Sequence, residues 1–218
     1  MSEATLMGPL EDFLVRARRG LRQTPPTSFA RARVQDVNGD HVLAPDPAAE
    51  VFEREPRHAA VLVPVVARPE PTVLLTLRAT TLSTHAGQIS FPGGRLDPED
   101  KDEMAAALRE AWEEVGLGPQ SIEPLGFLDG YLSGTGFWIT PVVARVEAGY
   151  SLTINPAEVQ EAFEVPLSVL MSPDSYERHS AMRNGVMRHF YAVPYEGRFI
   201  WGATAGMLRN MYERMYAA

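Results

Sequence analysis

The stretch that decides the fold is FPGGRLDPEDKDEMAAALREAWEEVGL, residues 91–117. Its second half, residues 104–117, carries apolar side chains at helical spacing, which predicts an amphipathic helix. The predicted apolar face comprises Leu108, Ala111, Trp112 and Val115. Gly116 can take the left-handed conformation that ends many helices, and Asp100 followed by Glu103 has the spacing of a capping box at the helix start.

Strand patterns lie on both sides of this helix. Residues 59–68 and 72–79 are apolar, β-branched runs separated by Pro69-Glu70-Pro71, which predicts two strands around a turn. Further strands are predicted at residues 88–91, 125–132 and 137–147. Because strands precede and follow one central helix, we expect an α+β sandwich rather than a doubly wound sheet. A second helix is predicted over residues 201–218.

Three carboxylates gather on one side of the central helix. Glu110, Glu113 and Glu114 stand at positions i, i+3 and i+4, so their like charges repel within a single turn. No lysine lies between Glu110 and Val115 to relieve this repulsion, which points to another cation. Oxygen ligands of this kind suit Mg²⁺ or Mn²⁺. Taken alone the cluster also fits an ordinary solvated helix face, so both interpretations stay open at this point.

Composition excludes several classes of site. The chain of 218 residues has no cysteine, which excludes disulfides, thiolate metal ligands and a cysteine nucleophile. Its formal net charge of −8 argues against a nucleic-acid-binding surface, which needs a basic footprint. No apolar run approaches the roughly 20 residues of a membrane span, and residues 1–23 lack the apolar stretch of a signal peptide. We therefore expect a cytoplasmic enzyme; composition leaves its oligomeric state open.

The segment before the first strand carries its own signals. Leu6, Leu10, Phe13 and further apolar residues recur at mainly helical spacing and are followed by clustered arginines. Such a helix could be a transit peptide or contact lipid, but the interspersed acidic residues favour a helix docked on the protein core. Residues 23–57 are rich in proline, alanine and charge and are interpreted as an ordered arm or loop. We expect residues 1–57 to pack on a catalytic domain that spans residues 58–218.

The motif that ends the opening stretch resembles a known family signature. Residues 109–117, REAWEEVGL, resemble the Nudix box, R-E-U-x-E-E-x-G-U. The resemblance implies an α/β/α sandwich with a mixed sheet that hydrolyses nucleoside diphosphates linked to another moiety. Two departures are present: the spacing from Gly94 to Arg109 is one residue longer, with Asp100 where a glutamate usually stands, and Ala111 replaces a bulky aliphatic residue.

The preceding residues resemble one subgroup of that family. LLTLRATTLSTHAGQISFPGG, residues 74–94, is similar to the motif that precedes the box in coenzyme A pyrophosphatases, as are NPAEVQEAFEVPLSVLM, residues 155–171, and IWGATAGML, residues 200–208. Ser83 stands where that motif usually has arginine. The resemblance implies hydrolysis of coenzyme A to 4′-phosphopantetheine and adenosine 3′,5′-bisphosphate. A pyrophosphatase acting on ADP-ribose or NADH, or a non-catalytic nucleotide-binding module, is the alternative.

Roles follow from these motifs for a small set of residues. The expected metal ligands are the carbonyl of Gly94 and the carboxylates of Glu110, Glu113 and Glu114; the expected catalytic residues are Glu110, Glu113 and Glu158; the expected substrate-binding residues are Arg78, His85 and Arg95. Glu158 fits a catalytic base, an extra ligand or an exposed glutamate at a helix start equally well. Arg109 is expected to hold the glutamates by ion pairing, and Asp100 is either a helix cap or a supporting group. The implied reaction is in-line attack of water on phosphorus, assisted by Mg²⁺ or Mn²⁺.

Overall fold

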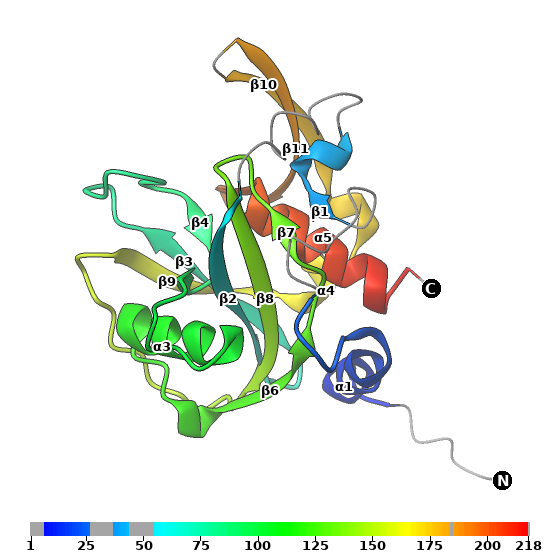
Figure 1. Cartoon of the computed structure of the whole chain (residues 1–218). Coiled ribbons are helices and arrows are strands. Elements are labelled where there is room, and N and C mark those ends of the chain that lie inside the picture. Colours follow the sequence, from blue (N-terminus) through cyan, green and yellow to red (C-terminus); the bar gives the residue numbers. More distant parts are fainter. Residues whose placement is uncertain (1–6, 27–36, 44–54, 184, 218) are drawn as a thin grey trace, which may run out of the picture.

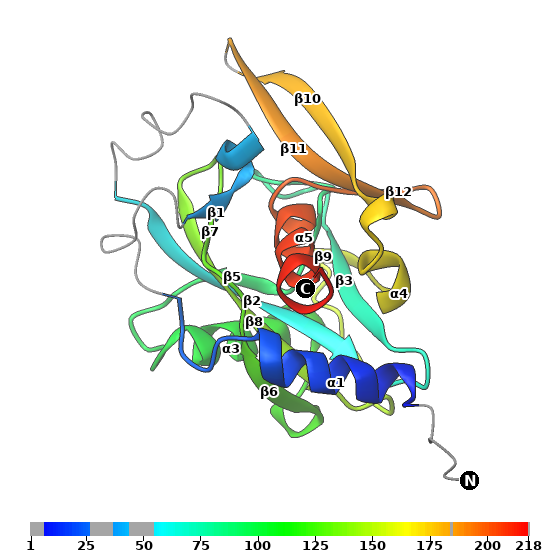
Figure 2. The same cartoon turned by 90° about the vertical axis from the view of Figure 1, so that its right-hand side faces the viewer.

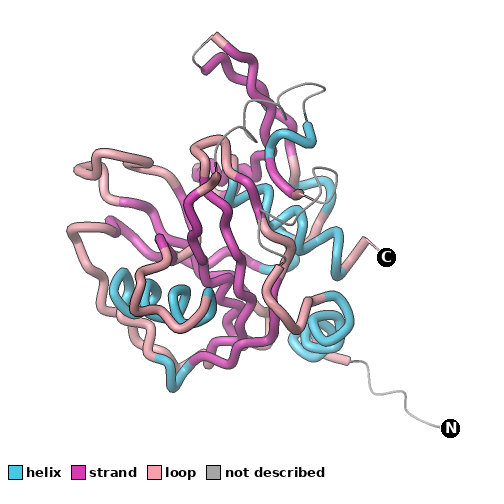
Figure 3. The backbone as a smooth tube through the Cα atoms, in the orientation of Figure 1, coloured by secondary structure: helices cyan, strands magenta, loops and turns pink. Residues whose placement is uncertain are grey.

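The computed structural model describes residues 7–26, 37–43, 55–183 and 185–217. Most of the predicted arm, residues 27–36 and 44–54, lies outside the described residues, as does Leu6. The described elements form a central mixed sheet between helices, with a second, smaller sheet at one end (Figures 1 and 3). None of the helices in these ranges has the length and apolarity needed to cross a membrane.

The central sheet is built around two long parallel strands. β2 (Arg57–Val66) and β8 (Phe137–Val146) pair in parallel over their whole length, from Arg57 opposite Phe137 to Val66 opposite Val146. The strand order is β1-β7-β8-β2-β3-β4, with β5 also pairing with β2, β6 with β8 and β9 with β3. The remaining strands of this sheet are β1 (Asn38–Gly39), β3 (Thr72–Arg78), β4 (Ile89–Ser90), β5 (Gly93–Arg95), β6 (Ile122–Phe127), β7 (Tyr131–Leu132) and β9 (Val159–Pro166).

The predicted strands are confirmed, with one division. The predicted strand at residues 125–132 is two strands, β6 and β7, which both pair antiparallel with β8 and are separated by residues 128–130. Parallel and antiparallel pairs coexist, since β2 pairs in parallel with β8 but antiparallel with β3 and β5. The mixed-sheet sandwich expected from the sequence is therefore confirmed.

One face of the sheet is covered by α3 (Glu103–Val115). This helix buries Ala106, Ala107, Ala111 and Val115 against Ala60, Leu62 and Val142 of the strands. Small side chains let the helix approach the strands closely. The prediction that Trp112 shares the apolar face is wrong, because its side chain is 57% exposed and lies on the rim of the helix beside Leu108 and Pro119.

The ends of α3 differ from the sequence prediction at one position. The helix ends at Gly116, which has a φ of 68° in the left-handed region, as predicted. Its N-cap is Asp102, whose carboxylate accepts a hydrogen bond from the N–H of Ala105 at 2.8 Å. The capping box predicted from Asp100 is therefore wrong, and the Asp100 carboxylate is left for a different contact.

The opposite face is covered by α1 (Pro9–Gly20) and α5 (Ala203–Met215), as Figure 1 shows. Phe13 and Ala17 of α1 are 0% and 1% exposed and share one core with Leu208 and Met211 of α5. Arg214 of α5 donates a hydrogen bond to the carbonyl of Gly20 at 2.8 Å. Helices from the two ends of the described chain therefore pack together over the same sheet face. α5 confirms the predicted second helix.

A three-stranded sheet extends beyond α5. It comprises β10 (Glu177–Arg183), β11 (Val186–Tyr195) and β12 (Arg198–Trp201), all antiparallel. Figure 2 shows the β10–β11 hairpin projecting from the body of the molecule. Val193 and Ile200 on its inner face are fully buried. Thr204, just after β12, donates a hydrogen bond to the carbonyl of Ile89, which joins this end of the chain to β4.

Candidate active site

The candidate site lies where β5 packs against α3. We call it the cradle, and it comprises Gly94 of β5 and Glu110, Glu113 and Glu114 of α3. Gly94 pairs with Ala60 of β2, and its missing side chain would point at the carboxylate of Glu110. A Cβ atom at Gly94 would overlap all three atoms of that carboxyl group. The close approach therefore needs glycine, and it brings the backbone of β5 directly beside Glu110.

Glu114 is the most deeply buried carboxylate at this point, with 1% of its surface exposed. The N–H of Gly93 donates a hydrogen bond to Glu114 Oε2 at 3.2 Å, and Arg78 Nη1 lies 3.2 Å from Glu114 Oε1. Burial raises the pKa of Glu114 to about 7, and the nearby charges of Glu110 and Glu158 add to that rise. Arg78 and the Gly93 N–H oppose it but do not cancel it. A further positive charge is therefore favoured here.

Arg109 links the other carboxylates. Its Nη1 lies 3.0 Å from Glu110 Oε1 and 2.9 Å from Glu113 Oε2, and its Nη2 lies 2.9 Å from Asp100 Oδ2. It also donates a hydrogen bond to the carbonyl of Arg95 at 3.1 Å. The hydrogen bonds from Arg109 to Asp100 hold the pKa of the Asp100 carboxyl below its usual range. The ion-pairing role predicted for Arg109 is confirmed, and Asp100 supports the array rather than capping the helix.

Glu158 reaches the same cluster from a distant loop. Its negative charge contributes to the raised pKa of both Glu110 and Glu114. The loop is fixed by Asn155, whose N–H donates to the carbonyl of Glu114 at 2.9 Å and whose Nδ2 donates to Glu158 Oε1 at 3.0 Å. Glu158 precedes β9 in a turn, so the alternative that it opens a helix is wrong. Asn155 was not among the predicted site residues, although the Asn-Pro pair marks a turn in the sequence.

Comparison with known proteins shows which family the chain belongs to. Residues 56–191 match the NUDIX domain family, which covers more than half of the chain. The chain belongs to the Nudix hydrolase family. Its relatives include Nudix hydrolase NudL of Photorhabdus laumondii, 42% identical over 82% of this chain and 95% of that protein, and NudL of Yersinia pestis, 40% identical over 85% and 92%.

Two solved structures are similar to part of this chain. An Ap4A hydrolase of C. elegans is 20% identical, with a TM-score of 0.44 over 50% of this chain and 80% of that one. The NUDIX domain of Shewanella oneidensis NrtR, crystallised with ADP ribose, is 24% identical, with a TM-score of 0.42 over 62% and 86%. Family membership makes this chain a Nudix hydrolase, a class of enzymes that acts on nucleoside-diphosphate-linked substrates and generally uses divalent metal ions.

The residues of the Nudix hydrolase fit such an ion in charge and in donor type. Carboxylates and the backbone carbonyls beside Gly94 are the oxygen donors that Mg²⁺ and Mn²⁺ prefer. One arginine, Arg109, faces four carboxylates, so negative charge exceeds positive charge around it. The four carboxylates are those of Asp97, Asp100, Glu110 and Glu113. In the described part of the chain, no three acidic or histidine side chains are placed so that they could hold a metal ion together. In this structure Arg109 forms ion pairs with Glu110 and Glu113, and Arg78 forms one with Glu114.

The three expected substrate-binding residues differ in their contacts and in their exposure to solvent. Arg78 is bound to Glu114, so it supports the cradle directly. His85 is exposed on the loop between β3 and β4, has a φ of 56° and pairs with Gln88 at 2.7 Å. Arg95 is exposed, follows Gly94 directly and lies over the ring of Phe137. Of the three, Arg95 combines a nearby position with a side chain open to solvent.

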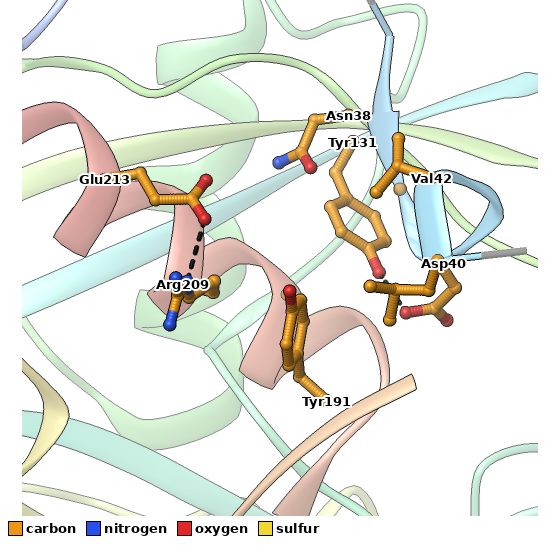
Figure 4. A pocket seen from close by; sticks show the side chains of 10 residues that line it. Asn38, Asp40, Val42, Tyr131, Tyr191, Arg209 and Glu213 are labelled. Atoms are coloured by element: carbon orange, nitrogen blue, oxygen red, sulfur yellow. Dashed lines mark hydrogen bonds and ion pairs between the residues drawn. The ribbon is translucent and has the colours of Figure 1, made fainter. Parts of the chain in front are cut away.

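A small cavity lies elsewhere in the Nudix hydrolase. It has a volume of about 50 Å³ and lies between residues 38–43 and α5, where its polar lining includes Asn38, Asp40, Tyr131, Tyr191, Arg209 and Glu213 (Figure 4). The hydroxyl of Tyr131 donates a hydrogen bond to Asp40 Oδ1 at 2.6 Å, and burial raises the pKa of Asp40. Its lining residues do not include the glutamates of the cradle. The cavity is therefore separate from the chemistry described above.

Proposed function

We propose that this Nudix hydrolase cuts the diphosphate bond of coenzyme A, or of an acylated or oxidised derivative, to give 4′-phosphopantetheine and adenosine 3′,5′-bisphosphate. The observation that carries the proposal is the contact between three separate segments, two of which line the glutamate cradle. These are residues 74–94, 155–171 and 200–208, the segments whose sequences resemble coenzyme A pyrophosphatases.

Individual contacts join the three segments. Arg78 in the first segment pairs with Glu114, and the N–H of Ala79 donates to the carbonyl of Glu158 in the second at 2.8 Å. Thr204 in the third segment donates to the carbonyl of Ile89 in the first at 3.0 Å. The first two segments thus reach the cradle, and the third, at the start of α5, contacts the first at β4. This supports a common role for the three motifs in holding one substrate.

The chemistry of the cradle suits water attack on a diphosphate. Gly94, through its carbonyl, and Glu110, Glu113 and Glu114 would hold Mg²⁺ or Mn²⁺, which when bound neutralises the diphosphate and lowers the pKa of the attacking water. Arg109 fixes Glu110 and Glu113 in position, since it binds both carboxylates. Glu158, oriented by Asn155, accepts the proton from the attacking water. No covalent intermediate with the protein is required.

Product analysis tests the proposal. The protein is incubated with coenzyme A, ADP-ribose or NADH, each with Mg²⁺ or Mn²⁺, and the products are separated by chromatography. We expect 4′-phosphopantetheine and adenosine 3′,5′-bisphosphate from coenzyme A as the fastest reaction. A faster reaction with ADP-ribose or NADH contradicts the proposed substrate but leaves the family unchanged. Glu110→Gln serves as the control for a contaminating hydrolase.

A further inference from the structure

Two arginines share one aromatic ring at the start of the central strand pair. The guanidinium carbon of Arg57 lies 4.0 Å from the ring centroid of Phe137, and that of Arg95 lies 5.5 Å from it. Arg57 pairs with Phe137 across β2 and β8, and Arg95 pairs with Ala59 across β5 and β2. Because side chains alternate along strands, all three project from the same face of the sheet.

The charge balance of this cluster differs from that of most described arginines. Most described arginines bind a carboxylate: Arg16, Arg22, Arg68, Arg78, Arg109, Arg145, Arg198, Arg209 and Arg214. Within residues 55–183 and the other described ranges, neither Arg57 nor Arg95 has such a partner, and Arg57 donates a hydrogen bond only to the carbonyl of Thr135, at 3.3 Å.

Two unpaired guanidiniums on one ring repel each other, and this occurs in a protein whose net charge is −8. Both side chains are exposed, so the positive charge faces solvent. An anion placed between them would relieve the repulsion. The planar donors of arginine match a phosphate group well, and the ring of Phe137 restricts where each guanidinium can lie.

The cluster begins one residue from the cradle. Arg95 follows Gly94, and consecutive Cα atoms are about 3.8 Å apart. The carbonyl of Arg95 is held by Arg109, the residue that also binds Glu110 and Glu113. Consecutive strand residues point to opposite faces, so the Arg95 side chain projects from the sheet face opposite the one on which Gly94 meets Glu110. A substrate with its diphosphate at the cradle would therefore reach this cluster past the edge of β5. The other predicted cations are engaged, since Arg78 binds Glu114 and His85 pairs with Gln88.

We propose that Arg57, Arg95 and the ring of Phe137 form a binding site for a phosphate monoester carried by the nucleotide half of the substrate. The inference rests on the proposed function, under which this group is the 3′-phosphate of coenzyme A. It assigns a role to Arg57 and Phe137, and it supplies a cation near the cradle in a chain where Ser83 stands at the position of a motif arginine. Arg57 is the residue that tests it most cleanly, because Arg95 also contributes its backbone to the cradle.

The test compares Arg57→Gln and Arg57→Lys with a matched control, Arg145→Gln. Arg145 lies on the same strand pair as Phe137 but at its opposite end, opposite Val65. For each protein, kcat/KM is measured for coenzyme A and for dephospho-coenzyme A. We expect Arg57→Gln to lower the ratio of the two values about tenfold, mainly through KM, because one charge-assisted contact to the 3′-phosphate is lost. Arg57→Lys should keep part of the ratio, and Arg145→Gln should keep all of it.

A binding measurement separates this inference from the proposed function. Calorimetry with adenosine 3′,5′-bisphosphate and with 5′-AMP reports on the site without any hydrolysis. Wild-type protein should prefer the bisphosphate, and Arg57→Gln should lose that preference. An unchanged ratio or preference in Arg57→Gln, or an equal loss in Arg145→Gln, overturns the phosphate site. A wild-type protein that binds the bisphosphate preferentially but leaves coenzyme A uncut contradicts the proposed function and retains the site.

Discussion

Arg78 at the end of β3 places a guanidinium nitrogen 3.2 Å from a carboxylate oxygen of Glu114 on α3. The contact joins the segment before the Nudix box to the box itself. Glu114 is otherwise buried, and the N–H of Gly93 binds its second oxygen. Contacts from β3 and β5 therefore fix the position of this carboxylate. A carboxylate held in this way is preorganised to bind a ligand, unlike a mobile group on the surface.

Removing the charge of Glu110 or Glu114 should abolish most of the activity. We expect Glu110→Gln and Glu114→Gln each to lower kcat by at least about a hundredfold, because each loses a charged group at the metal cradle. Circular dichroism should show that the fold survives. Glu123→Gln is the control, since Glu123 is a glutamate on β6 whose side chain is 63% exposed. Wild-type turnover in either cradle variant would show that the carboxylates are not ligands.

Gly94 offers a test that depends on backbone approach. Gly94→Val should abolish activity because the added side chain overlaps the carboxylate of Glu110. The effect on the melting temperature should be smaller, since the half-exposed glycine lies at the edge of the core. Gly149→Val is the matched control, because a Cβ at Gly149 meets no atom within 4 Å. An active Gly94→Val enzyme would contradict the close packing of β5 against the glutamates.

Glu164 provides a pH-dependent contribution to stability away from the cradle. Hydrogen bonds from Arg68 lower the pKa of Glu164 from 4.5 to about 2, and Thr72 and Tyr150 add further hydrogen bonds to the carboxylate. A lowered folded-state pKa stabilises the fold above the unfolded value of 4.5. This contribution is lost as the pH falls from 4.5 towards about 2.

Denaturation of Glu164→Gln at a series of pH values measures that contribution. The variant should be less stable than the wild type at neutral pH, and the two free energies of unfolding should converge as the pH falls below 4.5. The direction follows because only the wild type takes up a proton at this position. A constant difference across the acid range would show that the lost hydrogen bonds, rather than the charge, account for the effect.

The sequence predicts those parts of the fold that carry a strong local pattern. Val63, Val65 and their neighbours form an apolar run because both faces of β2 are covered, and α5 shows a helical period. The hairpin of β10 and β11 has no comparable pattern. In β10 polar residues such as Arg178 and Ser180 alternate with others that are also exposed, so no buried face marks the strand.

The site shows the same division between local and distant information. Glu110, Glu113 and Glu114 could be grouped from their spacing on one helix, and Arg109 from its place beside them. The position of Glu158 depends on how the loop before β9 returns to α3, which spacing along the chain does not encode. Trp112 was misplaced because helical spacing alone does not tell which side of a broad apolar stripe meets the sheet.

The measurement that tests the central proposal most directly is the ratio of kcat/KM for coenzyme A to that for ADP-ribose, at one fixed metal concentration and pH. Dephospho-coenzyme A is measured beside them, so that the value of the 3′-phosphate is known separately. We predict that coenzyme A is the best of the three substrates and that its products are 4′-phosphopantetheine and adenosine 3′,5′-bisphosphate. A higher kcat/KM for ADP-ribose would contradict the proposed substrate.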